Sequence, residues 1–474
     1  MTKLTLLQSL IRNALIETIL LVLILVPRPA AGILDIRKAR QFDADGNYIS
    51  AASAYATAAQ RLPWEPSLWE KAGQAYLKGN DYYPAEYAFE DAVQRRALSP
   101  DGYLGYGDTV FALGDPGLAV DLWNGLLDRG GDPSILLPRI AHGYRDLALY
   151  SDEMNTWQEY LVYQPGDAAA HYRLGLLLAT TSPADALPEL MLADRLNPSL
   201  DPPVESLRSA LNIAFLSDDR AYQLLVSGRT LGAMGNWQLA AIAFQNAIAI
   251  RADYADAWAW LGEAKQQQGQ DGSVEIERAI AFNPDSAMVE SLYGIYLQRQ
   301  KQPKQALAAI QKAAALEPGN PGWQMALGEA YEETGDLVTA LTYYQKATTL
   351  SPDDATFWQA LAEFSLRNNL DLAGTGLPAA RKLVELASND WQSDDIAGQI
   401  LMETDDLVGA EVLLKKAIEL DPTQAAPFLH LGLFYLQTGD RMAAFSYLNQ
   451  AKSGFDPDGS IGWQANRLLE QYFP

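Results

Sequence analysis

The chain has 474 residues, of which 49% are hydrophobic and 20% charged, a balance typical of a folded protein rather than a disordered one. Its net charge of −24 opposes binding to a nucleic-acid backbone, and the sequence holds no local basic stripe that would overcome this charge. The absence of cysteine excludes thiolate nucleophiles, disulfides and sulfur-based zinc sites, and three scattered histidines argue against a histidine-rich metal site.

The first 31 residues differ in character from the rest of the chain. Lys3 and Arg12 precede an apolar run that ends at Val26, and small residues follow as far as Ala31. This order is typical of a secretory signal peptide or of a retained N-terminal anchor. A full membrane span needs roughly 20 apolar residues, a length that this run reaches only by including polar residues. Cleavage after Ala31, retention as an anchor, and an amphipathic helix that packs on the next segment all stay open. We expect a membrane-anchored or exported protein rather than a cytoplasmic one.

A repeat of 34 residues follows this segment. In the stretches that begin at Trp69, Trp258 and Phe428, the aromatic residue is followed four places on by glycine. Twelve units can be aligned, with first residues at Gly32, Pro66, Pro100, Ser134, Ala168, Ala221, Ala255, Ala287, Pro321, Ala355, Trp391 and Ala425. The eighth position of each unit is always small: Ala39, Gly73, Gly107, Ala141, Gly175, Gly228, Gly262, Gly294, Gly328, Ala362, Gly398 and Gly432.

The second half of each unit carries two further small residues and ends near a proline, as in Ala306, Ala313 and Pro318. A small residue where two helices cross lets their backbones approach, and large residues around it fill the remaining space. Proline ends the second helix because it lacks the N–H group and clashes with the preceding turn. The pattern therefore predicts helix hairpins that stack on one another and complete each other's core.

This pattern resembles the tetratricopeptide repeat family over about residues 32–458, with large residues at repeat positions 4, 7, 11 and 24 and small ones at positions 8, 20 and 27. The resemblance implies an all-α fold, a right-handed α-solenoid of about 12 helix hairpins with a C-terminal capping helix. Three units depart from the pattern. The fourth has Glu153 and Tyr160 at small-residue positions, the seventh is about two residues short around 269–273, and the tenth has an insertion around 370–376.

The register breaks once, after Pro198, where prolines open an extra helix. We therefore expect the following segments: an N-terminal signal peptide or membrane anchor at 1–31, about five repeats at 32–198, a connector with an extra helix at 199–220, about seven repeats at 221–458, and a capping helix at 459–474. The connector could be a rigid joint or a hinge.

Four pairs of adjacent aspartates are the first candidates for chemistry, and they begin at Asp218, Asp353, Asp394 and Asp405. A hydrolytic dyad is one interpretation. A role at a helix N-terminus or in a solvated turn is favoured instead, because all four pairs fall at expected helix boundaries, where aspartate accepts backbone N–H bonds. The segment 43–47 resembles part of a calcium loop but lacks the closing glutamate, so a turn is favoured. No sequence motif of an enzyme or cofactor site is present, and we expect no catalytic residues, no cofactor and no metal.

In the tetratricopeptide repeat family, the first helix of each hairpin lines a concave groove, and repeat positions 2, 5, 9, 12 and 13 usually face the ligand. The resemblance therefore implies candidate groove residues for partner binding at Arg40, His142, Arg145, Glu263, Glu329, Glu332, Glu333 and Glu363. The Lys/Asn set by which some members hold a partner's C-terminal carboxylate is not found at the matching positions. An acidic groove predicts a partner with a basic segment; a merely solvated surface is the open alternative.

These observations favour a non-catalytic scaffold that binds a partner protein or peptide in the concave groove, at a membrane or cell envelope. An alternative is an accessory or regulatory subunit of a membrane-associated enzyme such as a glycosyltransferase or protease. A third reading, an enzyme that uses acidic groove residues, has little support because no segment outside the repeats is long enough for a catalytic domain. Substrate turnover by a fragment that begins near Ile33 would revive that reading.

Overall fold

The computed structural model describes residues 27–96 and 98–473. The described chain is helical, with a single isolated β-bridge between Gln424 and Phe455 and no β-strand within the described ranges. The predicted all-α solenoid fold is confirmed. The chain divides into two compact units, one made of residues up to 219 together with 226–234, and the other of 220–225 together with 235–474.

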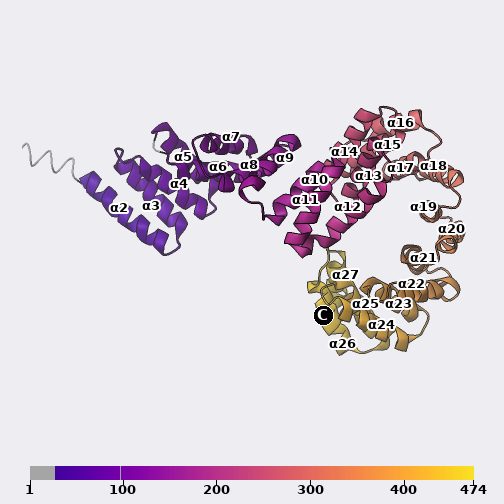
Figure 1. Cartoon of the computed structure of the whole chain (residues 1–474). Coiled ribbons are helices and arrows are strands. Elements are labelled where there is room, and N and C mark those ends of the chain that lie inside the picture. The colour runs from indigo at the N-terminus through magenta and orange to yellow at the C-terminus, as the bar shows by residue number, and fades with distance from the viewer. Residues whose placement is uncertain (1–26, 97, 474) are drawn as a thin grey trace, which may run out of the picture. The chain divides into compact units, whose positions relative to one another are not determined.

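The first unit consists of consecutive helix hairpins (Figure 1). Their helices are α2 (Pro27–Ala44) and α3 (Tyr48–Arg61), α4 (Ser67–Lys78) and α5 (Tyr82–Gln94), α6 (Pro100–Ala112) and α7 (Pro116–Leu127), α8 (Pro133–Asp146) and α9 (Tyr150–Tyr163), and α10 (Ala168–Leu178) and α11 (Pro183–Leu196). A short 3-10 turn, η1 (Pro198–Leu200), then leads into the single helix α12 (Asp201–Ala214), where the sequence predicts an extra helix.

The second unit begins within α13 (Arg220–Ala233), whose residues are divided between the two units. Its helices are α14 (Trp237–Ile250), α15 (Ala255–Gln267) and α16 (Ser273–Phe282), α17 (Ala287–Arg299) and α18 (Pro303–Leu316), α19 (Pro321–Glu333) and α20 (Leu337–Leu350), α21 (Ala355–Arg367) and α22 (Leu377–Leu386), α23 (Trp391–Glu403) and α24 (Leu407–Leu420), α25 (Ala425–Thr438) and α26 (Arg441–Ser453), and the final helix α27 (Ser460–Tyr472). The insertion in the tenth repeat forms a π-helical turn, η2 (Leu372–Gly376).

The first helices begin within one residue of the repeat starts that the sequence predicts, except for α2. Helix α2 begins at Pro27, five residues before the expected start at Gly32, so residues 27–31 belong to the first hairpin. Proline is well tolerated in the first turn of a helix, because the N–H group that it lacks has no partner there. Gly32 also packs on the second helix of this hairpin, since a Cβ there would lie 2.7 Å from Leu62 Cγ.

The glycine at repeat position 8 lies directly against the large residue of the partner helix. A Cβ on Gly73 would lie 2.8 Å from the Phe89 ring, and a Cβ on Gly328 would lie 2.9 Å from the Tyr344 ring. The same contact recurs between Gly107 and Trp123, Gly175 and Leu190, Gly262 and Ile276, Gly294 and Ile310, Gly398 and Leu414, and Gly432 and Leu448. These distances are shorter than a carbon–carbon contact allows, so these eight hairpins close only because position 8 carries no side chain in them.

Gly107 and Gly125 lie in one hairpin, in α6 and α7, and provide a matched prediction. A Cβ at position 107 would lie 2.3 Å from Trp123 Nε1, whereas a Cβ at position 125 would meet no atom within 4 Å. Gly107→Ala should therefore lower the midpoint of urea unfolding, because overpacking costs typically ~1–3 kcal/mol. Gly125→Ala should raise it slightly, because alanine is the better helix former by about 1 kcal/mol. Far-UV circular dichroism measures both midpoints, and equal midpoints for the two variants would contradict this contact.

Candidate partner-binding face

Several first helices contact the first helix of the next repeat: α4 contacts α6 in the first unit, and in the second unit α15 contacts α17, and α19, α21, α23 and α25 contact one another in sequence. We call the surface of the first helices the first-helix face. In the second unit, polar side chains join one first helix to the next along it: Arg299 of α17 reaches α15, Gln298 of α17 reaches α19, and Arg367 of α21 also reaches α19. The candidate residues of the later repeats all lie on this face.

Glu263 is held by an arginine of the next repeat. Arg299 donates from Nη1 to Glu263 Oε2 over 2.6 Å and from Nη2 to Glu263 Oε1 over 2.7 Å. Glu263 itself is buried, and Gln267 donates a further hydrogen bond to its Oε1 at 2.8 Å. Both carboxylate oxygens are therefore occupied within the chain, so Glu263 connects two repeats rather than presenting a free charge.

Glu332 is also satisfied within the chain. It accepts hydrogen bonds from Asn368 Nδ2 at 2.8 Å and from the Tyr344 hydroxyl at 3.0 Å, and it pairs with Arg367 at 3.3 Å. Burial acts to raise the pKa of Glu332, but these hydrogen bonds outweigh burial and the pKa is lowered. The same Arg367 lies 3.5 Å from Glu363, which also accepts a bond from Gln359.

Glu329 and Glu333 on α19 lack a compensating cation. Gln298 donates to Glu333 at 3.1 Å, and neither glutamate forms an ion pair with any residue of the described chain. Burial raises the pKa of Glu329, and the negative charges of Glu332 and Glu333 raise it further. Glu329, Glu332, Glu333 and Glu363, which we call the acidic cluster, thus keep an excess of negative charge close to α19.

The sequence predicts these glutamates but not the arginines that neutralise some of them. Arg299 and Arg367 both occupy repeat position 13, in the eighth and tenth units. Position 13 is one of those expected to face the groove, so a count of cations as well as anions at these positions could have found them. The groove of the second unit is therefore less acidic than its glutamates alone suggest.

In the first unit, the structure brings His142 and Arg145 together on α8, whereas Arg40 lies on α2. Arg145 donates from Nε to Glu153 Oε1 at 3.0 Å, and the His142 ring lies edge-on to Trp157 with centroids 5.6 Å apart. Arg40 is exposed and lines a separate recess of about 320 Å³. Sequence reasoning noted Glu153 only as a departure from the repeat pattern and did not connect it with Arg145.

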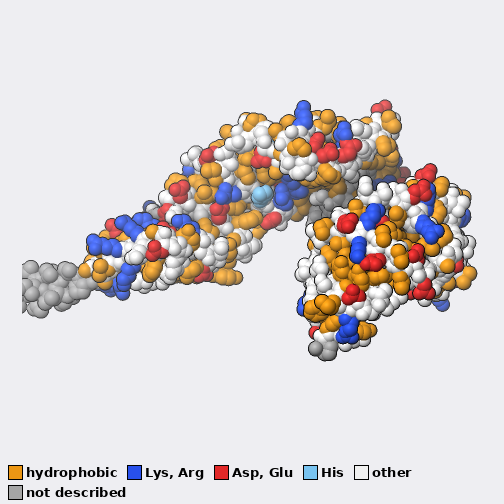
Figure 2. All heavy atoms as spheres, turned by 90° about the horizontal axis from the view of Figure 1, so that it is seen from below, with side chains coloured by type: hydrophobic (Ala, Val, Ile, Leu, Met, Phe, Trp, Pro, Cys, Tyr) orange, Lys and Arg blue, Asp and Glu red, His pale blue; other side chains and the backbone are white. Residues whose placement is uncertain are grey.

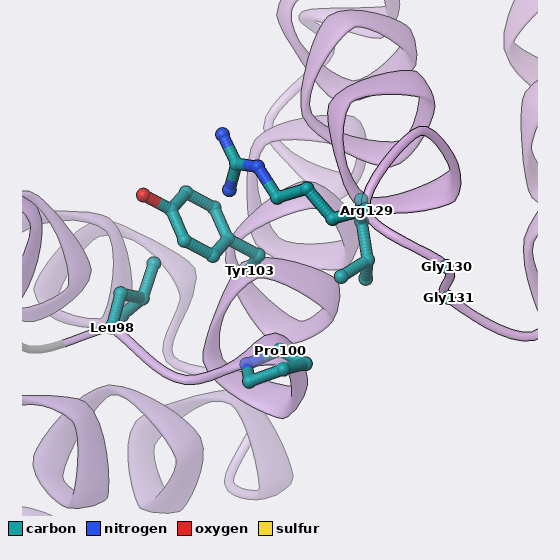
Figure 3. A pocket seen from close by; sticks show the side chains of 7 residues that line it. Leu98, Pro100, Tyr103, Arg129, Gly130 and Gly131 are labelled. Atoms are coloured by element: carbon teal, nitrogen blue, oxygen red, sulfur yellow. The ribbon is translucent and has the colours of Figure 1, made fainter.

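A further recess of about 260 Å³ lies near the start of α6 and the end of α7 (Figure 3). The Arg129 guanidinium stacks over the Tyr103 ring at 4.8 Å from its centroid, and Leu98, Pro100 and two glycines complete most of the wall. This recess has room for a side chain. Its lining contains no carboxylate, histidine, serine or threonine.

The aspartate pairs have structural partners. Asp354 and Asp406 cap α21 and α24, as the sequence predicts. Asp394 and Asp395 lie near the start of α23 but do not cap it, because Asp390 does so. Both are buried, and they pair with Lys416 at 2.7 Å and with His430 at 2.9 Å respectively. Within residues 27–96 and 98–473, no three His, Asp or Glu side chains are placed to hold a metal ion.

Residues 294–355, which span the eighth and ninth units, match the family model described as Tetratricopeptide repeat. No curated protein matches the sequence. Among solved structures, yeast Tom70 is 17% identical with a TM-score of 0.41, over 93% of this chain and 95% of that one. Cut9 in the Cut9–Hcn1 hetero-tetramer of the APC/C is 14% identical with a TM-score of 0.38 (92% and 95%), and Pseudomonas aeruginosa PilF is 22% identical with a TM-score of 0.38 (46% and 98%).

The family match rests on sequence, and the helix contacts give independent support for it. The small-against-large contact found at Gly294 and Gly328, inside the matched segment, recurs in both directions along the chain from Gly73 to Gly432. Such an array of helix hairpins serves as a scaffold for protein–protein interaction. The matched segment thus carries tetratricopeptide repeats, and the recurring contact extends the same helix-hairpin architecture along the described chain.

Proposed function

We propose that this scaffold is non-catalytic and binds a basic segment of a partner protein at the acidic cluster of its second unit. The observation that carries the proposal is the pair Glu329 and Glu333, which lack a compensating cation although arginines neutralise their neighbours Glu263 and Glu332. Like charges held together cost free energy that an incoming lysine or arginine removes. The pKa of Glu329 is raised first by burial and then by the charges of Glu332 and Glu333, so part of the shift comes from this repulsion in the unbound chain.

The double variant Glu329→Gln/Glu333→Gln should bind a lysine peptide, acetyl-(Lys)6-amide, more weakly than the natural chain. Each lost contact of this kind is worth on the order of 1 kcal/mol at low salt, so we expect a loss of about thirtyfold for the pair, measured by titration calorimetry. Binding by the natural chain should also weaken with acid at a pH above the usual glutamate range, because protonation of Glu329 begins there.

The matched control is Glu277→Gln/Glu419→Gln, which removes the same charge from exposed positions on the second helices α16 and α24. Since the whole chain is acidic, some binding of a lysine peptide is unspecific, and this control measures that part. Equal losses for the two double variants would show that net charge rather than the acidic cluster attracts the peptide.

We further propose that the scaffold works at a membrane, to which its N-terminal segment attaches it. The apolar run that ends at Val26 lies outside the described residues, and the first described helix begins directly after it. Exposed cations gather on this end of the first unit (Figure 2, left): Arg28, Arg37, Lys38 and Arg40 on α2, with Lys71 on α4. No described helix combines the length and the apolar character that crossing a bilayer would need.

The surface around these cations is also apolar. The exposed fractions of Ile33, Leu34 and Trp64 are 51%, 55% and 61%. None of the five cations forms an ion pair within the described chain. An end cap of a solenoid needs a polar outer face for solubility, yet exposed apolar and basic side chains together are typical of a surface that meets anionic lipid headgroups.

The full chain should sediment with phosphatidylcholine vesicles and more completely with vesicles that also contain phosphatidylglycerol. Arg37→Glu/Lys38→Glu should remove the preference for the anionic vesicles, because each basic residue contributes about 1 kcal/mol near such a surface. Lys301→Glu/Lys304→Glu is the control, since both lysines are exposed and belong to the second unit. Failure of the natural chain to sediment with either vesicle would contradict membrane attachment.

A further inference from the structure

Glu153, at the start of α9, is a fully buried carboxylate at repeat position 20, where most other units have alanine. Three side chains donate to it. Arg173 of α10 donates from Nε to Oε1 at 2.7 Å and from Nη2 to Oε2 at 2.8 Å. Trp157 Nε1 and Arg145 Nε donate to Oε1 at 3.1 and 3.0 Å. Glu153 therefore fixes side chains from three successive helices at one point.

The positive charge around Glu153 exceeds the single negative charge of its carboxylate. Burial acts to raise the pKa of Glu153, but the hydrogen bonds and charges of Arg173 and Arg145 outweigh burial and lower it, so the side chain is an anion at neutral pH. Arg173 alone, through its two-pronged contact, already neutralises that anion. Arg145 brings a second positive charge, which no further buried carboxylate balances.

Arg145 keeps most of its hydrogen-bonding capacity unused. A guanidinium has five N–H donors, and in Arg145 only the one on Nε has an acceptor within the described chain. Arg139, on the same helix, differs: it donates from Nε and Nη2 to Asp108 and from Nη1 to the Ile135 carbonyl. The side chains are equally accessible, at 37% and 38%. Arg145 thus presents its two Nη groups, the edge that matches a carboxylate.

The surroundings of Arg145 suit an anion. His142 lies one turn earlier on α8 and is exposed. Burial of its ring against neighbours, and then the charge of Arg145, lower the pKa of His142, so the ring is neutral at pH 7 and can still donate one N–H. The one other carboxylate that acts on His142 is Asp146, which is exposed and forms no ion pair with any residue in the described part of the chain.

We propose that the Nη edge of Arg145, held in place by Glu153, binds a side-chain carboxylate from an acidic segment of the partner protein. This inference deepens the proposed scaffold function and depends on it. His142 is a second donor beside the site, and Arg173 is a positioning residue because it acts through Glu153. The first unit then recognises an acidic segment and the second unit a basic one, so the partner carries both kinds of charge in separate stretches.

The test uses the full chain and the probe acetyl-(Glu)6-amide, whose binding is measured by titration calorimetry at low salt. Arg145→Gln should weaken binding about tenfold or more, as expected when a charge-assisted contact is lost. Arg139→Gln removes the same charge from the same helix and should change binding less than about twofold. Asp146→Asn should tighten binding, because it removes an exposed negative charge beside His142 that would repel the peptide. In Arg145→Gln, Glu153 keeps Arg173 and Trp157, so we expect the fold to persist by circular dichroism.

Arg145→Lys is a second variant should Arg145→Gln fail to fold. It keeps the charge but loses the two-pronged edge, so its binding should lie between those of the natural chain and of a variant without charge. A peptide with one terminal carboxylate, acetyl-(Gln)6 with a free C-terminus, distinguishes side-chain from terminal carboxylates. The proposal is overturned if the natural chain binds neither peptide, if only the terminal carboxylate binds, or if Arg145→Gln and Arg139→Gln weaken binding equally. In each case, binding of acetyl-(Lys)6-amide still reports separately on the second unit.

Discussion

The small size of the residue at repeat position 8, glycine or alanine, is the constraint on which the rest of the structure depends. At eight glycines in that position, the large residue of the partner helix fills the space that a Cβ would occupy, as Phe89 does against Gly73. Because the two helices meet there, each hairpin exposes one apolar side that only the next hairpin can cover. Stacking then places the first helices side by side, and the polar face they form follows from the same contact.

The fold was predictable because this contact leaves a periodic trace in the sequence. Small residues every 34 places predict where helices cross, and the helices begin within one residue of the predicted starts in all units but the first. The first helix begins at Pro27, whereas the repeat alignment alone predicts a start at Gly32. The start of this helix depends on local chemistry, such as the tolerance of proline in a first turn, that a repeat alignment does not contain.

The candidate site was predictable only in outline. Repeat position shows that Glu263 and Glu332 lie on the first-helix face, but not that Arg299 and Arg367 of the following repeats reach back to them. Such pairing depends on whether a side chain of one unit contacts a side chain of the neighbouring unit. The spacing of residues within one unit does not show this. For the same reason Glu153 appeared to be a flaw in the repeat, although it organises two arginines from neighbouring helices.

A size exchange at Gly73 and Phe89 tests the central contact most directly, because the three atoms nearest to a Cβ at position 73 all belong to the Phe89 ring, at 2.8–2.9 Å. The measurement is the urea midpoint of Gly73→Leu, of Phe89→Ala and of the double variant. Each single change should lower the midpoint, one by overpacking and the other by leaving a cavity. The double variant should recover part of the loss because the added side chain fills the cavity. Additive losses, as for independent sites, would contradict the account.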